Sequence, residues 1–295
     1  MSETQHHHPL VARNVKFQWE STPQPWLPGD SFTSHFINVL HLLLPEGELW
    51  FCRLYNQALP EIEDETLRAD VKGFIRQEAI HSRSHQVVLD SYFADNGIVT
   101  EPYTRRVRWL FTDLLGENPF GITTEMQWVK RAWLTFRLGL IAAIEHFTCV
   151  IGRWILECRG LDEAGADPVM MDLLRWHGAE EVEHRTVAHD LFEQRGGGYL
   201  YRVMLMLLVG PMLLVLWFLG TRFFLRQDPS ADQNLKFIRE WRRAARQDRL
   251  PTMAFLWLSV WRYLRPGYHP RDEAETGQAL DYLQRSPAAV AAAAR

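Results

Sequence analysis

Residues 177–184 read HGAEEVEH, and within this stretch Glu181 and His184 form an E-x-x-H pair. At 3.6 residues per turn, positions three apart project from one face of a helix, so both side chains can bind one metal ion. The pair recurs in RQEAIHSRSH, residues 76–85, as Glu78 and His81. Charged residues three apart are also common on exposed helices. The inference of a metal site therefore requires further potential ligands elsewhere in the chain.

One glutamate precedes each pair, at a distance that suits a preceding helix. Glu48 lies in PEGELWF before the first pair, and Glu145 lies in IAAIEHFTCVIG before the second. The flanks of Glu145 are apolar on almost every side, and an ionised carboxylate there is costly unless it is paired or bound to metal. Glu46 is an alternative to Glu48, but its position between Pro45 and Gly47 places it less securely on a helix.

The chain thus repeats one unit, a helix with one glutamate followed by a helix with E-x-x-H. Four antiparallel helices with this set of side chains are typical of di-metal carboxylate proteins. We predict an all-α fold, a ferritin-like four-helix bundle with a C-terminal helical extension. Strand patterns are almost absent, and the spacing predicts three of the helices over about 62–94, 124–158 and 168–194.

Boundaries follow from prolines, glycines and capping residues. Residues 1–33 contain four prolines and are expected to be extended, residues 34–198 to form the bundle, residues 199–285 to form an apolar and basic helical extension, and residues 286–295 to form a frayed tail. Asp30 or Ser31 is suited to cap the first helix, and Pro45 marks a place where a helix begins or restarts.

Composition limits the class of protein. The chain has 295 residues, 47% of them hydrophobic, and a formal net charge of −4, which argues against nucleic-acid binding. Its three cysteines contain no C-x-x-C and fit a reducing compartment. The first residues lack the basic start and apolar run of a secretory signal. We therefore expect a cytoplasmic protein, and the sequence leaves its oligomeric state open.

The motifs resemble those of known families. Over about residues 35–195 the chain resembles the ferritin-like di-metal carboxylate proteins. PEGELWF, RQEAIHSRSH, HGAEEVEH and YLRPGYHP (residues 263–270) are similar to a bacterial family of predicted metal-dependent hydrolases. The H-x-x-x-E-x-x-H spacing that begins at His177 is similar to that of p-aminobenzoate N-oxygenase, a di-iron enzyme with an additional histidine ligand.

By position, this resemblance implies seven metal ligands: Glu48, Glu78, His81, Glu145, His177, Glu181 and His184. The alternative for His177 is a core histidine, or one that supports a ligand without binding metal. His85 and Glu180 are expected to hold ligands in place. Cys52 and Cys149 each follow a proposed ligand by four residues, and we expect them to be small buried side chains.

Mixed carboxylate and imidazole ligands suit two metal ions, iron in the first place and manganese or zinc as alternatives. Iron would make dioxygen a co-substrate and would require an electron donor. We therefore expect an oxidase or oxygenase that acts on a small or lipid-like organic substrate. A two-metal hydrolase is the second interpretation, and metal storage is a third.

Residues 203–221, VMLMLLVGPMLLVLWFLGT, carry no charge and are bracketed by Arg202 and Arg222. Their length and polarity suit a membrane-spanning helix. Gly210-Pro211 at the centre is able to kink the segment or fold it into a hairpin. Three interpretations stay open: a buried fifth helix, a spanning helix, or a shallow dock on the inner face of a membrane. The basic residues that follow would then meet anionic headgroups: Lys236, Arg239, Arg242, Arg243, Arg246 and Arg249.

Overall fold

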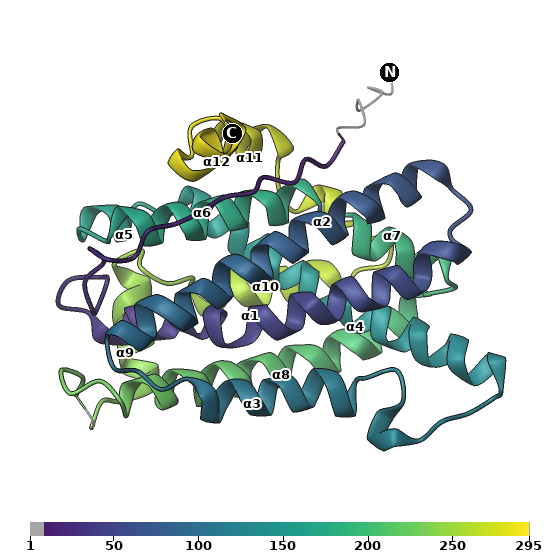
Figure 1. The fold of residues 1–295 in the computed structure, drawn as a ribbon, viewed down its shortest axis with the longest axis horizontal. Helices are drawn as coiled ribbons and strands as arrows, with labels where there is room; N and C mark the ends of the chain where they lie inside the picture. The colour runs from purple at the N-terminus through teal and green to yellow at the C-terminus, as the bar shows by residue number, and fades with distance from the viewer. Residues whose placement is uncertain (1–8, 233, 295) are drawn as a thin grey trace.

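The computed structural model describes residues 9–232 and 234–294, and within these ranges every regular element is helical. The predicted all-α bundle is confirmed. Four long helices form the bundle, with α1 packed against α2 and α4 packed against α6 (Figure 1). Their bounds are α1 Ser31–Ala58, α2 Glu65–Val87, α4 Gln127–Glu157 and α6 Pro168–Glu183.

Short elements connect these helices. They are the helices α3 Glu101–Trp109 and α5 Gly160–Glu163, the wider π turns Val88–Phe93 and Leu110–Leu114, and the 3-10 turns Leu59–Glu61 and Pro119–Gly121. Helix α7 Val187–Gln194 follows α6, and a further 3-10 turn, Pro270–Asp272, lies in the C-terminal third. The helix predicted over 168–194 is interrupted, because α6 ends at Glu183 and His184 has non-helical dihedrals (φ −100°, ψ 9°). The His184 side chain contacts the carboxylates of Glu78, Glu145 and Glu181, and these contacts outweigh the helical preference of this stretch.

An extended segment precedes α1 and lies along α6 (Figure 1). It buries Trp19 and Trp26, and residues 1–8 of the predicted extended region lie outside the described residues. The Asp30 carboxylate accepts the backbone N–H of Thr33 at 3.1 Å and caps α1, as predicted. The prediction that a helix begins or restarts at Pro45 is wrong, because α1 continues through this residue. Proline costs one backbone hydrogen bond, and the extensive burial of α1 outweighs that loss.

Helices α4 and α6 approach each other at two glycines. A Cβ atom built on Gly152 would lie 2.4 Å from the carbonyl oxygen of Gly178, and one on Gly178 would lie 2.8 Å from the Cα of Gly152. Only glycine at both positions permits this backbone contact. The crossing sets the position of His177, which directly precedes Gly178, and of Glu181, three residues after it.

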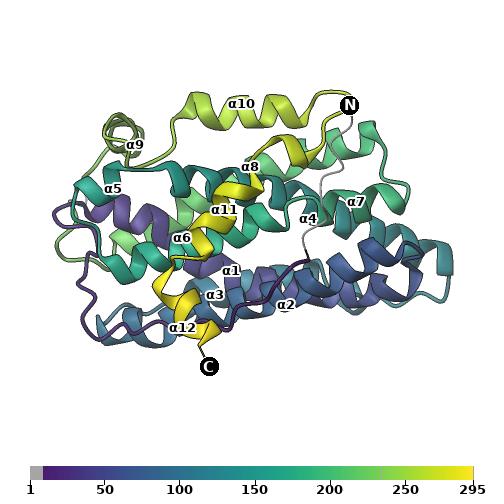
Figure 2. The ribbon, with the colours of Figure 1, turned by 90° about the horizontal axis from the view of Figure 1, so that it is seen from above.

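The C-terminal third adds five helices: α8 Tyr199–Leu225, α9 Phe237–Arg246, α10 Met253–Tyr263, α11 Thr276–Leu283 and α12 Pro287–Ala293. The expected frayed tail instead contains α12. Its first turn binds Asp172 of α6, whose carboxylate accepts the Ser286 hydroxyl at 2.7 Å and the backbone N–H of Ala288 at 2.9 Å. Figure 2 shows α11 crossing over α6 and α12 lying beyond the crossing, and both helices contact α6.

Helix α8 runs through Gly210-Pro211 as one helix, so the hairpin alternative is wrong. By length and composition alone, α4 and α8 are both apolar enough to cross a membrane. The most apolar window of α4 is 72% buried, as expected of a core helix, whereas that of α8 is only 22% buried. Helix α8 therefore is not a buried fifth helix. One side packs on α1 and α4, and the other is exposed.

Candidate metal centre

The four long helices and the residue after α6 bring all seven predicted ligands together in the interior. They form two groups in which one potential ligand atom from each residue lies within 4.8 Å of the others. Group A consists of Glu48, His81, His177 and Glu181, and group B consists of Glu78, Glu145, Glu181 and His184. All of these residues are buried. Glu181 belongs to both groups.

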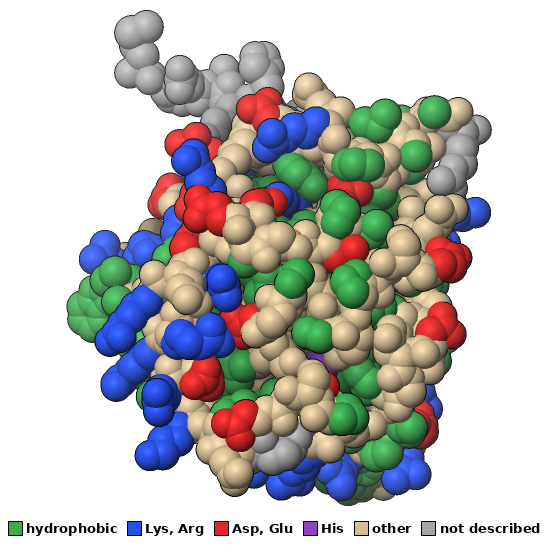
Figure 3. Space-filling view, turned by 90° about the vertical axis from the view of Figure 1, so that its left-hand side faces the viewer, with side chains coloured by type: hydrophobic (Ala, Val, Ile, Leu, Met, Phe, Trp, Pro, Cys, Tyr) green, Lys and Arg blue, Asp and Glu red, His purple; other side chains and the backbone are tan. Residues whose placement is uncertain are grey.

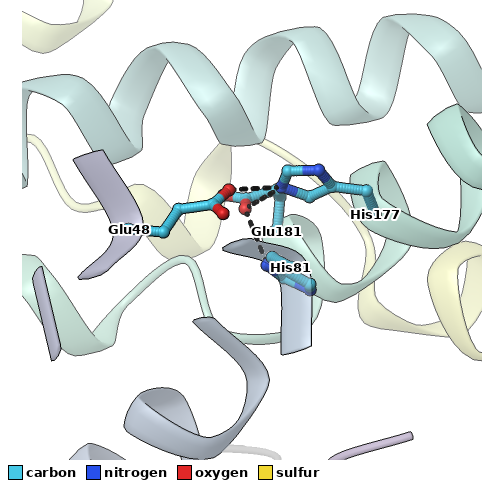
Figure 4. A group of neighbouring side chains, drawn as sticks. All are labelled: Glu48, His81, His177 and Glu181. Atoms are coloured by element: carbon cyan, nitrogen blue, oxygen red, sulfur yellow. Dashed lines mark hydrogen bonds and ion pairs between the residues drawn. The ribbon is translucent and has the colours of Figure 1, made fainter. Parts of the chain in front are cut away.

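In group A the side chains point toward one another from α1, α2 and α6 (Figure 4). His177 Nε2 lies 2.6 Å from Glu181 Oε1 and 3.5 Å from Glu48 Oε1. His81 Nδ1 lies 3.5 Å from the same Glu181 oxygen. His177 therefore stands beside the other predicted ligands, as the resemblance implied, and presents a ring nitrogen to their carboxylates.

Group B gathers three carboxylates around one imidazole nitrogen. His184 Nε2 lies 3.3 Å from Glu78 Oε1, 3.2 Å from Glu145 Oε2 and 3.3 Å from Glu181 Oε2. Glu181 thus turns Oε1 toward group A and Oε2 toward group B. A carboxylate with one oxygen on each side is suited to bridge two metal ions.

The second ring nitrogen of each imidazole is hydrogen-bonded on the outside of the groups. His81 Nε2 donates to Glu180 Oε2 at 2.9 Å, and His184 Nδ1 donates to Gln77 Oε1 at 3.0 Å. A carboxylate or amide oxygen only accepts, so each outer nitrogen carries a proton. Although burial opposes it, Glu181 and then Glu145 hold the pKa of His184 well above its usual range, so its inner nitrogen would give up a proton when a metal binds. Such contacts fix the tautomer and orientation of metal-binding histidines. Glu180 therefore contacts one of the proposed ligands, and its supporting role in metal binding stays a prediction.

His177 is held by two further histidines. Its Nδ1 lies 2.5 Å from His85 Nε2, and His85 Nδ1 lies 2.7 Å from His41 Nδ1. Burial, then the neighbouring His177, lowers the pKa of His85 well below its usual range and the pKa of His41 to about 3, so both rings are neutral. In this structure the Glu181 carboxylate accepts the inner N–H of His177 at 2.6 Å. If a metal took the place of that proton, each ring would donate outward to the next.

An outer layer of charged side chains fixes these supports. Arg13, from the extended segment, donates to Glu180 at 2.8 Å and to Glu183 at 2.9 Å. Gln77 also donates to Glu183, at 2.7 Å. The sequence interpretation did not include Arg13, Gln77, Glu183 or His41. His41 lies seven residues before Glu48 on the same helix face, which was a usable signal. Arg13 offered none, because only the folded chain brings it to α6.

Crowding of carboxylates dominates the electrostatics. Burial, then the neighbouring Glu181, raises the pKa of Glu78 and of Glu145 to about 8. Burial and Glu78 raise the pKa of Glu48 well above its usual range. Although burial opposes it, His184 and His177 hold the pKa of Glu181 well below its usual range. Without cations the groups therefore retain protons that bound metal would displace.

The donor set fits two metal ions. Glu48 and Glu78 are buried, yet among the described residues neither oxygen of either carboxylate accepts a hydrogen bond. Buried polar atoms are normally hydrogen-bonded, and unsatisfied ones indicate a partner such as an ion. Four carboxylates also balance the charge of two divalent cations. Groups A and B would each hold one ion, and Glu181 would contact both.

The other sequence candidates lie outside both groups. The Glu46 carboxylate turns away from both groups and forms an ion pair with Arg108, in which Glu46 Oε1 lies 2.6 Å from Arg108 Nε. Cys52 and Cys149 are buried free thiols, as expected. The Cys52 Sγ lies 3.4 Å from the Ile75 carbonyl oxygen, and burial, then Glu78, raises the pKa of Cys52 to about 12. Neither thiol has the depressed pKa of a reactive cysteine.

An apolar cavity of about 150 Å³ reaches group A. A cavity of this size accommodates a benzene-sized molecule. Glu48, His177 and Glu181 line it, and the other polar side-chain groups in the described lining are the Thr148 hydroxyl and the indole N–H groups of Trp154 and Trp217. Its walls come from α1, α4 and α8, including Phe36, Leu40, Ile151, Met212, Leu216 and Trp217. Group B meets the cavity only through the shared Glu181.

A helical bundle with two buried Glu and His groups is a metal-binding protein. A family model described as predicted metal-dependent hydrolase matches residues 11–274. The chain belongs to this family, and the predicted resemblance to it is confirmed. Searches of curated proteins and of solved structures found no match.

Proposed function

We propose that this protein is a di-iron oxidase or oxygenase that acts on a small, apolar organic substrate. The observation that carries this proposal is the meeting of group A with the apolar cavity. A substrate in the cavity would contact aliphatic and aromatic side chains, Thr148 and the group A side chains. An apolar site excludes water, which favours oxidation chemistry over competing reactions with solvent.

The ligand set supports iron. Four carboxylates and three imidazoles, from four helices and the residue after α6, suit iron or manganese, and a pair of such ions, when bound, supplies activation of dioxygen. The surrounding residues orient the ligands, since Glu180, Gln77 and His85 each hold one imidazole. Dioxygen would be the co-substrate, and an electron donor would be a partner.

Two-metal hydrolysis is the second candidate, and the description of the family favours it. Hydrolysis uses metal-activated water and benefits from hydrogen-bond donors placed where negative charge develops. In the described cavity wall outside group A, the Thr148 hydroxyl already donates to the Glu145 carbonyl oxygen and the Trp217 indole N–H to the Phe36 carbonyl oxygen, so few donors are left for a substrate. This scarcity of donors supports oxidation as the first proposal.

Metal analysis followed by two activity assays tests the proposal. Protein purified without added metal is expected to contain about two irons per chain. The reduced iron form is expected to consume dioxygen, and the zinc form is expected to be inert. The variant Glu48→Ala removes a carboxylate of group A. Glu46→Ala is its matched control, because Glu46 lies outside both groups. Cleavage of esters or amides by the zinc form, without oxygen uptake by the iron form, would establish the hydrolase. Iron far above two per chain would indicate storage.

A further inference from the structure

Helix α8 separates the cavity from the exterior of the molecule. Met212, Leu213, Leu216 and Trp217 are half-buried and line the cavity. Exposed apolar side chains occupy the outer side of the same turns: Leu214, Val215, Phe218 and Leu219. The same turns of α8 therefore carry apolar side chains on the outer surface and in the cavity.

Helix α10 extends this exposed surface. Leu250 and Pro251, just before α10, line the same cavity as the middle of α8. At the other end of α10, the Leu264 carbonyl oxygen accepts the Tyr199 hydroxyl at 3.0 Å, and Tyr199 begins α8. The two helices therefore lie alongside each other. We define the apolar face by their exposed residues: Leu207, Leu208, Leu214, Val215, Phe218 and Leu219 of α8, and Met253, Trp257, Leu258 and Trp261 of α10.

Cations border the apolar face. Arg222 and Arg226 are exposed at the end of α8, and α9 begins after Lys236. Three exposed arginines of α9 have helical spacing that places them on one side: Arg239, Arg242 and Arg246. In the end view of the molecule, Lys and Arg side chains gather along the left edge (Figure 3). An exposed apolar face with basic borders matches a bilayer with anionic headgroups.

From these features we propose that the apolar face docks on an anionic membrane and that the cavity receives the alkyl chain of a membrane amphiphile. The cavity takes the chain because its wall is hydrocarbon, and an unpaired charged headgroup there would be costly. The cytoplasmic leaflet is the anionic surface that the basic border fits. That the alkyl chain is the substrate rests on the proposed function. Membrane docking and binding of the alkyl chain do not, because both are expected of the metal-free protein.

Vesicle sedimentation tests the docking. Wild-type protein is expected to pellet with vesicles of phosphatidylglycerol and phosphatidylcholine, more weakly with phosphatidylcholine alone, and less in high salt. Arg239→Gln/Arg242→Gln/Arg246→Gln is expected to weaken binding to the anionic vesicles by at least about tenfold. Trp257→Gln/Trp261→Gln should weaken binding to both kinds of vesicle. Trp128→Gln is the matched control, because Trp128 is 70% exposed on α4, outside the apolar face.

Calorimetric titration of metal-free protein with 1-octanol tests the cavity. Wild-type protein is expected to bind octanol, and Ile151→Phe, which fills the cavity from α4, is expected to bind at least about tenfold more weakly while sedimenting with vesicles like wild type. Protein that stays in the supernatant with anionic vesicles, or self-associates through α8, would overturn the docking. Absence of octanol binding by the wild type would overturn the chain site. Neither result alters metal content or oxygen uptake, which test the proposed function separately.

Discussion

His85 Nε2 lies 2.5 Å from Nδ1 of His177, so a buried neutral imidazole fixes the ring that closes group A. The same ring of His85 is itself held by His41 at 2.7 Å. Two histidines on α1 and α2 thus set the orientation of a side chain on α6. A metal ion bound by His177 would depend on residues that never contact it.

His85→Phe is expected to weaken binding of one metal ion by about 10- to 100-fold, because His177 loses its outer hydrogen bond. Competition with a chelator measures the dissociation constant. His189→Phe is the control, since His189 is equally buried but lies outside both groups. His41→Phe should have a smaller effect than His85→Phe. Equal weakening by the His85 and His189 variants would show that only a general loss of core packing is involved.

Single removals of carboxylates should separate the two groups. Glu48→Ala is expected to lose the ion of group A, and Glu145→Ala the ion of group B, each lowering metal content by about one equivalent per chain. Glu181→Ala should lower it further, because Glu181 faces both groups. Elemental analysis after dialysis provides the measurement. Two tightly bound ions in all three variants would refute the ligand assignment, and Glu46→Ala should keep both.

Local spacing explains why the helices and the seven residues of the two groups were predictable. Each E-x-x-H pair marks both a helix and the direction in which two side chains point, and the apolar flanks of Glu145 indicate burial. The same local logic erred at Pro45 and at His184. In both places long-range packing outweighs the local preference, since α1 continues through one and α6 ends before the other.

Residues that act through the fold were not predictable in this way. Arg13 reaches Glu180 and Glu183 across more than half of the chain, and no periodic pattern relates these positions. The cavity also depends on which sides of α1, α4 and α8 face one another. A hydrophobic segment as uniform as residues 203–221 gives no such information, because every side of the helix is apolar.

The glycine crossing provides a test of how α4 and α6 position the site. Gly152→Ala would place a methyl group against the Gly178 backbone, with no flexible side chain able to yield. We expect a loss of about 1–3 kcal/mol in the free energy of unfolding, measured by urea denaturation, together with weaker metal binding at group A. Gly277→Ala on α11 is the control, because its new methyl group meets open space and should be neutral or slightly stabilising. Equal stability of the two variants would contradict the close crossing.

Metal binding is expected to release protons, and Glu78 and Glu145 are expected to set how the release changes between pH 7 and pH 9.5. Glu48 and His184, whose pKa values are also raised well above their usual ranges, would add to the release. Burial, then the neighbouring Glu181, raises the pKa of both carboxyls to about 8 in the metal-free protein, so at pH 7 they are mostly protonated. Ligands must be deprotonated to bind a cation, so each ion that enters displaces protons. The protonated fraction falls as the pH rises through 8. Proton release should therefore be larger at pH 7 than at pH 9.5, and apparent metal affinity should increase between these values.

Calorimetry in buffers of different ionisation enthalpy measures this release directly. More than about one proton per chain is expected at pH 7, and substantially fewer at pH 9.5. Glu145→Gln cannot ionise at this position, so the variant should release fewer protons at pH 7 and show a flatter dependence of affinity on pH. Glu46→Gln should behave like the wild type, because Glu46 pairs with Arg108 away from both groups. Proton release that is negligible at pH 7, or that grows toward pH 9.5, would show that these carboxyls are already ionised in the metal-free protein.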